Sequence, residues 1–280
     1  MEGHYTGHPT AWIRFWGCNL SCDGFGQDKP EDKSTWVLDY QTIDVSSITK
    51  MEHLPVFHRG CDSSYSWSKK FAHLAHTDTV SDICTKIENS MKSASNPDGK
   101  FLHPKSGQWN HMAFTGGEPM MNQSAIIDIM KEFGNRNNLP MYITIETNGT
   151  QEVRTIFRDY FWNYPGEVFW SVSPKLYLSG EEWDVAVKPE VVAGYFTQIS
   201  KHGQLKYVSN GTPRAWDEVE TATKSYREQG IDWPIWIMPV GADIEGQNKI
   251  AASVAEDAVD RGYNVAARVH TYLFGNVIGK

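Results

Sequence analysis

The sequence has few cysteines and no long hydrophobic run. Only four of its 280 residues are cysteine, which is too few for a disulfide scaffold in a chain of this length. No stretch of about 18 apolar residues is present, so we expect no transmembrane helix and no membrane association. Residues 1–10 lack the basic and apolar regions of a signal peptide. We therefore expect a cytoplasmic protein whose thiols stay reduced and available to bind a metal.

Positive charge is also scarce. The chain has 26 Lys and Arg residues against 34 Asp and Glu residues, for a formal net charge of −8. This balance argues against direct nucleic-acid binding, which needs a basic surface. Apolar residues make up 40% and charged residues 21% of the chain, so it can bury a core and is not of the disordered class. We find no internal repeat and no low-complexity tract.

Short apolar strands alternate with helical stretches along most of the chain. The apolar pattern predicts strands at 11–16, 111–114, 141–145, 168–172, 205–208, 235–238 and 265–269. Helical patterns lie between them at 80–91, 124–133, 153–161, 189–201, 216–228 and 249–261. This alternation implies parallel pairing and an α/β barrel or partial barrel, in which the chemistry lies at the C-terminal ends of the strands.

Residues 23–60 interrupt this alternation. The segment is polar, contains two prolines and has clustered charges, with 36–40 as its one candidate strand. We interpret it as a long loop inserted into a single domain that spans residues 1–280. A loop of this length is typically functional or mobile.

Three cysteines could form one metal site. Cys18 and Cys22 lie directly after the first predicted strand, and Cys61 follows after 38 intervening residues. Thiolates bind zinc or iron–sulfur clusters, and a cluster with three protein ligands leaves one iron open. A Cys3His zinc site that includes His58 is an alternative, as are three incidental thiols. Cys84 shares helical spacing with apolar neighbours, so we expect it in the core.

Polar residues stand at the ends of consecutive predicted strands. Thr115-Gly116-Gly117-Glu118-Pro119 ends one strand and precedes a helix. Its glycines allow a ligand close to the backbone, and the N–H groups with Glu118 could hold a carboxylate and an ammonium group. Similar polar stretches follow at 146–150, 173–175 and 204–208. Each could be an ordinary turn, but together they predict a site at the top of a barrel.

Taken together, these motifs resemble the radical S-adenosylmethionine superfamily and, within it, the 7-carboxy-7-deazaguanine synthases. The matching segments occur in family order and cover nearly the whole chain outside 23–60. They are residues 2–9, 13–14, 17–22, 61–67, 115–119, 146–150, 173–175, 205–208, 238–239 and 268–270.

The resemblance implies a partial (β/α) barrel of the radical SAM type and a lyase activity. A [4Fe–4S] cluster and S-adenosylmethionine would produce a radical that takes a hydrogen from 6-carboxy-5,6,7,8-tetrahydropterin, with Mg²⁺ assisting. The ring contracts, ammonia leaves, and 7-carboxy-7-deazaguanine forms for transfer-RNA (queuosine-type) or DNA modification. The cofactor carries the radical chemistry and the protein supplies position. A homodimer and an electron donor such as flavodoxin are also implied.

The resemblance also assigns roles to individual positions. Arg14 would bind the substrate carboxylate, which suits a guanidinium fork, and Ser63 would bind Mg²⁺, which prefers oxygen ligands. Glu2 and Thr115 would bind the pterin. The cluster ligands would be Cys18, Cys22 and Cys61. The residues implied to bind S-adenosylmethionine are Gly116, Gly117, Glu118, Ser173, Pro174, Lys175 and Lys206.

Three features depart from the family pattern. Cys61 lies beyond an insertion instead of two residues after Cys22, which is compatible with a site because the entropy of loop closure grows slowly with length. Ser63 replaces the usual threonine, and Met1 stands at a glycine position that a strand normally precedes. The insertion fits a divergent viral member, which would act in the host cytoplasm. The alternatives are another radical S-adenosylmethionine enzyme, such as a glycyl-radical activase, and a non-catalytic zinc-stabilised binding module.

Overall fold

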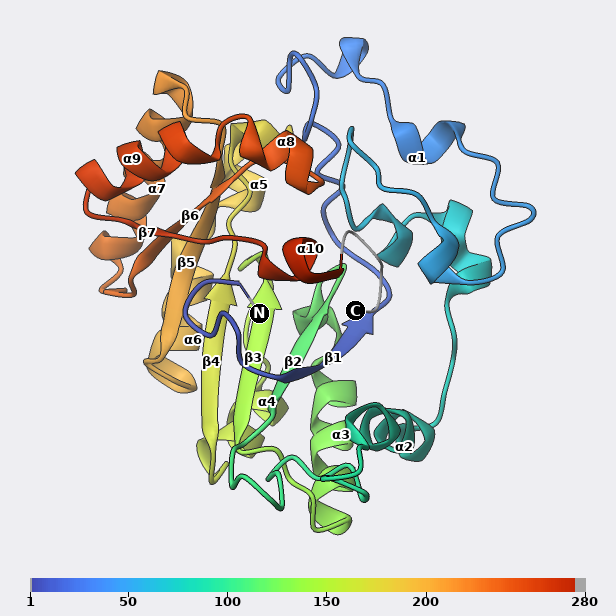
Figure 1. Cartoon of the computed structure of the whole chain (residues 1–280). Coiled ribbons are helices and arrows are strands. Elements are labelled where there is room, and N and C mark those ends of the chain that lie inside the picture. Colours follow the sequence, from blue (N-terminus) through green and yellow to red (C-terminus); the bar gives the residue numbers. More distant parts are fainter. Residues whose placement is uncertain (1, 275–280) are drawn as a thin grey trace.

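The computed structural model describes residues 2–274. Its centre is a seven-stranded sheet in which the strands follow one another in sequence order and all neighbours are parallel (Figure 1). The first and last strands form open edges, so the predicted α/β partial barrel is confirmed. The strands are β1 (Thr10–Phe15), β2 (His111–Gly116), β3 (Tyr142–Thr147), β4 (Glu167–Val172), β5 (Gly203–Ser209), β6 (Ile235–Pro239) and β7 (Asn264–Val265).

A long helix precedes each strand from β2 to β7. These helices are α2 (Val80–Met91), α3 (Gln123–Asn135), α4 (Thr155–Trp162), α6 (Pro189–Gln198), α7 (Pro213–Glu228) and α9 (Ala251–Asp260). Local capping explains several starts: the Thr79 side chain accepts the Asp82 N–H at 3.1 Å, and a proline opens α6 and α7. The short helices are α1 (Asp39–Thr42), α5 (Trp183–Ala186), α8 (Ile244–Asn248) and α10 (Val269–Phe274). Single 3-10 turns are η1 (Lys33–Thr35), η2 (Met51–His53), η3 (Ser64–Ser66), η4 (Lys69–Leu74), η5 (Pro119–Asn122) and η6 (Tyr177–Ser179).

The two faces of the sheet have different chemistry because strand side chains alternate. One face packs on the helices and forms the main apolar core, with Phe114 of β2 and Ile145 of β3 among its members. The other face, here called the inner face, carries the intervening side chains, several of them polar. The N-terminal segment runs across this inner face and α10 lies in front of it (Figure 1).

The prediction of a last strand at 265–269 is mostly wrong. β7 comprises only Asn264–Val265, and Val269 already begins α10. Arg268 lies between these elements, and its guanidinium donates to the carbonyls of Gly241 and Ala242 at 3.2 and 3.3 Å. These contacts hold the Arg268 side chain against the loop that follows β6.

The strand expected at 36–40 is also wrong. Asp39 begins α1, and its carboxylate accepts the backbone N–H groups of His58 and Arg59 at 3.1 and 3.0 Å. The segment therefore bends back toward the end of the insertion instead of pairing as a strand. The insertion is also less polar inside than its composition suggests, because it contributes to a small apolar cluster of Tyr40, Leu54, Phe57, Tyr65, Phe71 and Leu74. Within residues 2–274, no helix has the length and apolar character needed to cross a membrane.

Candidate functional site

The loop that carries Cys18 and Cys22 rests on the glycine turn after β2. The Glu118 N–H donates to the Gly17 carbonyl at 2.8 Å, and the Gly117 N–H donates to the Phe15 carbonyl at 3.1 Å. A Cβ atom on Gly117 would lie 2.1 Å from the Gly17 oxygen. Glycine at this position is therefore required for the close approach of the two loops.

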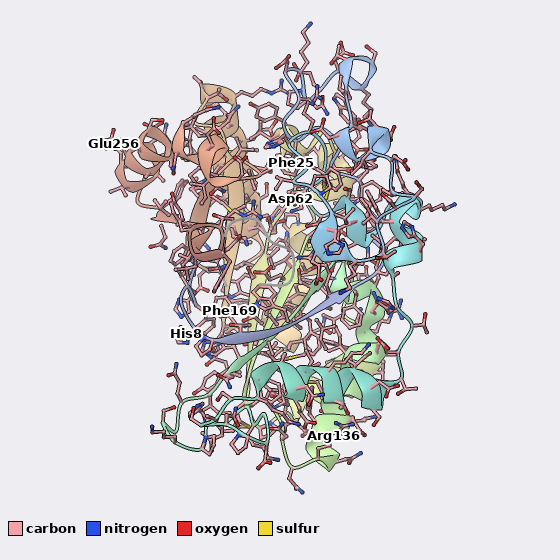
Figure 2. The ribbon with its side chains drawn as sticks, turned by 45° about the vertical axis from the view of Figure 1, so that its right-hand side comes forward. His8, Phe25, Asp62, Arg136, Phe169 and Glu256 are labelled. Atoms are coloured by element: carbon pink, nitrogen blue, oxygen red, sulfur yellow. The ribbon has the colours of Figure 1, made fainter. Side chains whose placement is uncertain are left out.

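The insertion ends beside its own beginning. The Gly60 N–H donates to the Phe25 carbonyl at 2.8 Å. A Cβ atom on Gly26 would lie 2.0 Å from the His58 carbonyl oxygen, so the two backbone segments are in direct contact. These contacts return Cys61 to the cysteine loop. Phe25 and Asp62 lie at one end of the sheet, whereas His8 lies toward the other end (Figure 2).

The three candidate cysteines are neighbours. Cys18 and Cys61 pack with Cys22 in one small apolar cluster. Burial raises the pKa of all three thiols, that of Cys61 to about 12, and the Lys175 ammonium opposes the rise in each. Within residues 2–274, no group of three or more His, Cys, Asp or Glu side chains is placed so that it could hold a single metal ion. Three sulfurs beside a cation nonetheless fit the chemistry of an iron–sulfur cluster or zinc.

Two further candidate ligands, the His58 imidazole and the Cys84 thiol, do not join the three cysteines. His58 is largely exposed, and its Nδ1 atom is 3.8 Å from the Asp243 carboxylate. The Cys3His zinc set is therefore not assembled in the described part of the chain. Cys84 is fully buried in the main core, with its sulfur 3.7 Å from the Ile129 carbonyl oxygen, as its helical spacing predicts.

Two polar residues to which the sequence analysis assigned no role hold the cysteine loop. Glu181 Oε1 accepts the backbone N–H groups of Ser21 and Cys22 at 2.8 and 2.6 Å. Cys22 has a φ of 53°, in the left-handed region, so this loop needs external support. Asn148 Nδ2 donates to Asn19 Oδ1 at 3.1 Å. Asn148 lies in the recognised 146–150 motif, whereas no local signal marks Glu181.

Glu118 is completely buried and its carboxylate already has partners. Oε1 accepts the Thr147 hydroxyl at 2.7 Å and the Met120 N–H at 2.9 Å, and Oε2 accepts the Asn148 N–H at 2.7 Å. Burial raises the pKa of this carboxyl group. The side chain braces the end of β2 against the end of β3. Contact between Glu118 and a cofactor ammonium group stays a prediction.

Two substrate candidates are direct neighbours on the inner face. Arg14 of β1 and Thr115 of β2 are register partners. The Arg14 guanidinium donates to the Gly116 carbonyl at 3.1 Å and lies 5.4 Å from the centre of the Tyr65 ring. Trp12, two residues earlier on the same face and 40% exposed, is an aromatic neighbour that the sequence analysis missed.

A set of largely buried charges joins Glu2 to Lys206 and Arg268 on this face. Glu2 Oε2 lies 2.7 Å from Lys206 Nζ, and Glu2 Oε1 lies 3.3 Å from Arg268 Nε. Lys206 Nζ is also 3.9 Å from Glu146, and Arg268 Nη2 is 3.3 Å from Asp62. Burial alone would lower the pKa of Lys206, but Glu2 and Glu146 outweigh it and raise this pKa. Lys206 therefore stays charged.

The remaining candidates lie at the same C-terminal edge of the sheet. The Ser63 hydroxyl donates to Asp62 Oδ1 at 3.2 Å, immediately after Cys61. In the loop after β4, Lys175 Nζ lies 3.3 Å from the Ser173 hydroxyl, and Pro174 is buried. The structure thus places the predicted cluster, cofactor, substrate and magnesium residues near one another. Their individual roles stay predictions, and Met1 lies outside the described residues.

Comparison with known proteins finds distant likenesses that extend along most of the chain. No family model matches the sequence. The chain is 25% identical to 7-carboxy-7-deazaguanine synthase of Halobacterium salinarum over 301 residues, which cover 98% of this chain and 86% of that protein. The solved structure of native anSMEcpe with bound AdoMet has a TM-score of 0.47 and 12% sequence identity, over 96% of this chain and 68% of that one. The structural likeness is too distant to carry an argument about function.

Proposed function

We propose that this chain is a radical S-adenosylmethionine enzyme and acts as a 7-carboxy-7-deazaguanine synthase. The observation that carries the proposal is the return of Cys61, across 38 residues, to Cys18 and Cys22 at the C-terminal edge of a partial barrel. The 25% identity to a synthase of that name, along 98% of the chain, supports the same reaction. The residues present fit an iron–sulfur cluster because three thiols pack in one cluster, and thiolates are the usual ligands of such clusters.

When bound, a [4Fe–4S] cluster with S-adenosylmethionine would supply the radical that opens the conversion of 6-carboxy-5,6,7,8-tetrahydropterin to 7-carboxy-7-deazaguanine and ammonia. Cys18, Cys22 and Cys61 would hold the cluster. Burial raises the pKa of each of these thiols, and the positive charge of Lys175 opposes that rise. Glu181 and Asn148 keep the cysteine loop in place from two sides.

The inner face would bind the pterin. The exposed Arg14 guanidinium, held by the Gly116 carbonyl and the Tyr65 ring, would pair with the substrate carboxylate in a charge-assisted contact. Glu2, fixed by Lys206 and Arg268, would accept hydrogen bonds from N–H groups of the pterin.

Four further parts of the proposal rest on the family resemblance. Gly116, Gly117, Ser173 and Pro174 would contact S-adenosylmethionine, together with Lys175. Ser63 would bind Mg²⁺ with the substrate. The enzyme would act as a homodimer, and a carrier such as flavodoxin would deliver its electron. A Ser63→Ala variant tests the magnesium site, because it should raise the Mg²⁺ concentration needed for half-maximal product formation.

The test is product formation by anaerobically reconstituted protein. The protein is loaded with iron and sulfide, then incubated with dithionite, S-adenosylmethionine, Mg²⁺ and 6-carboxytetrahydropterin, and the product is identified by mass spectrometry. Cys61→Ala should abolish both cluster loading and product. Cys84→Ala is the matched control, since Cys84 lies in the main core, and should retain both. Cleavage of S-adenosylmethionine without product would contradict the proposed substrate. A colourless, zinc-loaded protein would contradict the proposed radical activity.

A further inference from the structure

The side chain of Gln204, in β5, pairs with the backbone on both sides of Gly3. Its Oε1 atom accepts the His4 N–H at 2.9 Å, and its Nε2 atom donates to the Glu2 carbonyl at 3.2 Å. The side chain is 1% exposed, so these contacts are made away from bulk water. One side-chain amide thus binds two peptide groups of the N-terminal segment, where that segment crosses the inner face (Figure 1).

Gly3 is required for this contact. It has a φ of 78°, in the left-handed region that glycine adopts freely. A Cβ atom at this position would lie 2.3 Å from Oε1 and 2.6 Å from Nε2 of Gln204. Gly7, in the same segment, has a similar φ of 86°, but an added Cβ there would meet no atom within 4 Å. Space next to Gln204 therefore distinguishes position 3 from position 7.

The strands beneath fix the orientation of the Gln204 amide. Ser171 of β4 is its register partner, and the Ser171 hydroxyl accepts a hydrogen bond from Gln204 Nε2 at 2.9 Å. Lys206 follows two residues later on β5, so it lies on the same face as Gln204. Its Nζ atom is 2.7 Å from the Glu2 carboxylate. β5 therefore binds Glu2 at two points, the backbone through Gln204 and the carboxylate through Lys206.

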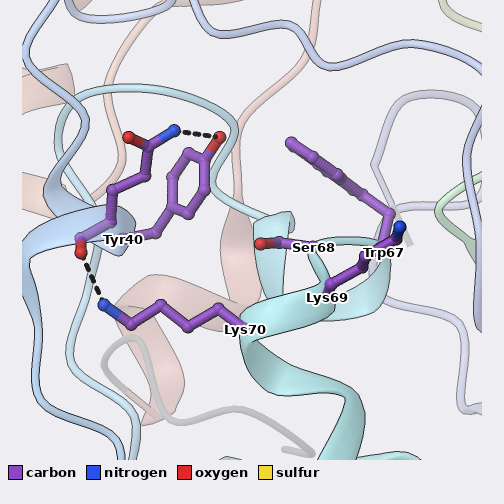
Figure 3. Close-up of a pocket in the computed structure, with 6 residues that line it drawn as sticks. Tyr40, Trp67, Ser68, Lys69 and Lys70 are labelled. Atoms are coloured by element: carbon purple, nitrogen blue, oxygen red, sulfur yellow. Dashed lines mark hydrogen bonds between the residues drawn. The ribbon is translucent and has the colours of Figure 1, made fainter.

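The hollow beside the insertion has a different construction. It has a volume of about 440 Å³ and is lined by Tyr40, Gln41, Trp67, Ser68, Lys69 and Lys70 (Figure 3). The Lys70 ammonium group donates to the Gln41 carbonyl at 2.5 Å, and Gln41 Nε2 donates to the Tyr40 hydroxyl at 3.4 Å. These contacts join α1 to η4. The contacts that hold Glu2 come instead from β5.

We propose that Gln204 is a positioning residue for Glu2: it sets the register of residues 2–4 across β5, so that the carboxylate of Glu2 is held beside Lys206. The role of Glu2 toward the pterin rests on the proposed function, whereas the backbone contact is a property of the chain without metal or substrate. A group that is already ordered loses less conformational freedom when its ligand binds. Gln204 would therefore contribute to substrate affinity without touching the substrate.

The contact is tested first on ¹⁵N-labelled chain without metal or substrate. Gln204→Met keeps the length of the side chain and removes both hydrogen-bonding groups. The His4 amide should then exchange with solvent about tenfold faster, because it loses its acceptor. Gln198→Met, at an exposed position, should leave this exchange rate unchanged. Wild-type exchange at His4 in Gln204→Met would overturn the proposal, whatever activity the enzyme shows.

Two glycine variants separate this contact from general backbone strain. Gly3→Ala and Gly7→Ala both place alanine at a positive φ, but only the Cβ at position 3 meets Gln204. Gly3→Ala should speed exchange at the His4 amide, and Gly7→Ala should not. The double variant Gly3→Ala/Gln204→Met should exchange no faster than the faster single variant, because both changes remove the same contact. Independent, multiplying effects on the exchange rate would overturn the proposal.

The positioning role is tested on reconstituted enzyme by steady-state kinetics. Gln204→Met and Gly3→Ala should raise the KM for 6-carboxytetrahydropterin about tenfold, with a smaller change in kcat. Iron content and the KM for S-adenosylmethionine should match the wild type, as they should in Gln198→Met. Loss of iron together with a general fall in kcat would reduce Gln204 to a structural residue and overturn the positioning role.

The remaining outcomes separate this proposal from the proposed function. Equal KM values for the pterin in wild type and Gln204→Met, with product formed by both, would overturn the positioning role and leave the proposed function standing. A His4 amide that responds to Gln204→Met, in a wild-type chain that forms no product, would uphold the placement of Glu2 by Gln204. That result would overturn the proposed function instead.

Discussion

The Lys206 ammonium group lies 2.7 Å from the Glu2 carboxylate and joins positions 204 residues apart in the chain. Lys206 comes from the middle of β5, and Glu2 comes from the N-terminal segment that crosses the inner face. Arg268 binds the same carboxylate and also contacts Asp62, next to Cys61. One set of charges thus links Glu2, Lys206 and Arg268 to Asp62, the neighbour of the displaced Cys61.

Removal of Lys206 should be costly for stability. Lys206→Met leaves Glu2 and Glu146 buried with less compensation, and loss of one partner of a buried pair typically costs about 3–5 kcal/mol. We expect a decrease of that size in the free energy of unfolding, measured with urea. Lys224→Met is the control, since its pair with Glu228 is exposed with a separation of 4.0 Å and should be worth below about 0.5 kcal/mol. Equal effects of the two substitutions would contradict the role of the network.

His111 should make the fold sensitive to mild acid. Burial, and then the nearby His8, lower the pKa of His111 from 6.5 to about 4. Between these pH values the unfolded chain binds a proton that the folded chain does not, so the free energy of unfolding decreases as the pH is lowered. The contribution of His111 is fully present above pH 6.5 and is lost progressively as the pH falls to about 4. Thermal unfolding measured across this range should show the decline.

The corresponding variant should flatten this pH dependence. His111→Gln cannot take up a proton, so its melting temperature should fall less steeply between pH 6.5 and pH 4, even if the variant is less stable at neutral pH. His76→Gln, at an exposed position, should keep the wild-type slope. A His111→Gln slope equal to that of the wild type would show that another group is responsible.

The fold was readily predicted wherever the local pattern was long and regular. The structure has α2 at the predicted 80–91, because a Thr79 cap precedes an apolar stripe that includes Ile83 and Ile87. The failures are short segments with long-range partners. β7 has two residues, and α1 forms where Asp39 is drawn to His58 and Arg59, about 20 residues further on.

Site residues could be predicted only where they belong to a recognisable sequence motif. Cys61 could be assigned from the residues that follow it, although its distance from Cys22 breaks the usual spacing. The role of Glu181 could not be predicted, because its partner Cys22 is 159 residues away in the sequence. No sequence periodicity indicates a single long-range hydrogen bond. The buried, bracing position of Glu118 was also invisible, since the sequence does not say which way a side chain turns at the end of a strand.

Gly117 should tolerate no side chain. In Gly117→Ala the new Cβ atom would lie 2.1 Å from the Gly17 carbonyl oxygen, which forces the cysteine loop away at a cost of about 1–3 kcal/mol. We expect lower stability in urea and lower iron content after reconstitution. Gly134→Ala is the control: this helical glycine has no atom within 4 Å of an added Cβ, and the variant should gain about 0.5–1 kcal/mol of stability. Normal iron content in Gly117→Ala would argue against the close packing of the two loops.

Glu181 should hold the cysteine loop without contacting the cluster itself. Glu181→Ala leaves the N–H groups of Ser21 and Cys22 without their acceptor, at a cost of about 1–3 kcal/mol, while the three thiols remain. We expect faster hydrogen exchange at these two amides and faster loss of iron to a chelator, with initial iron loading less affected. Glu182→Ala is the matched neighbour, because Glu182 is 75% exposed and its ion pair with Lys33 spans 3.6 Å at the surface. If both variants released iron at the wild-type rate, the loop would be held by Asn148 and the glycine turn alone, and the carboxylate at 181 would serve only to satisfy two amides.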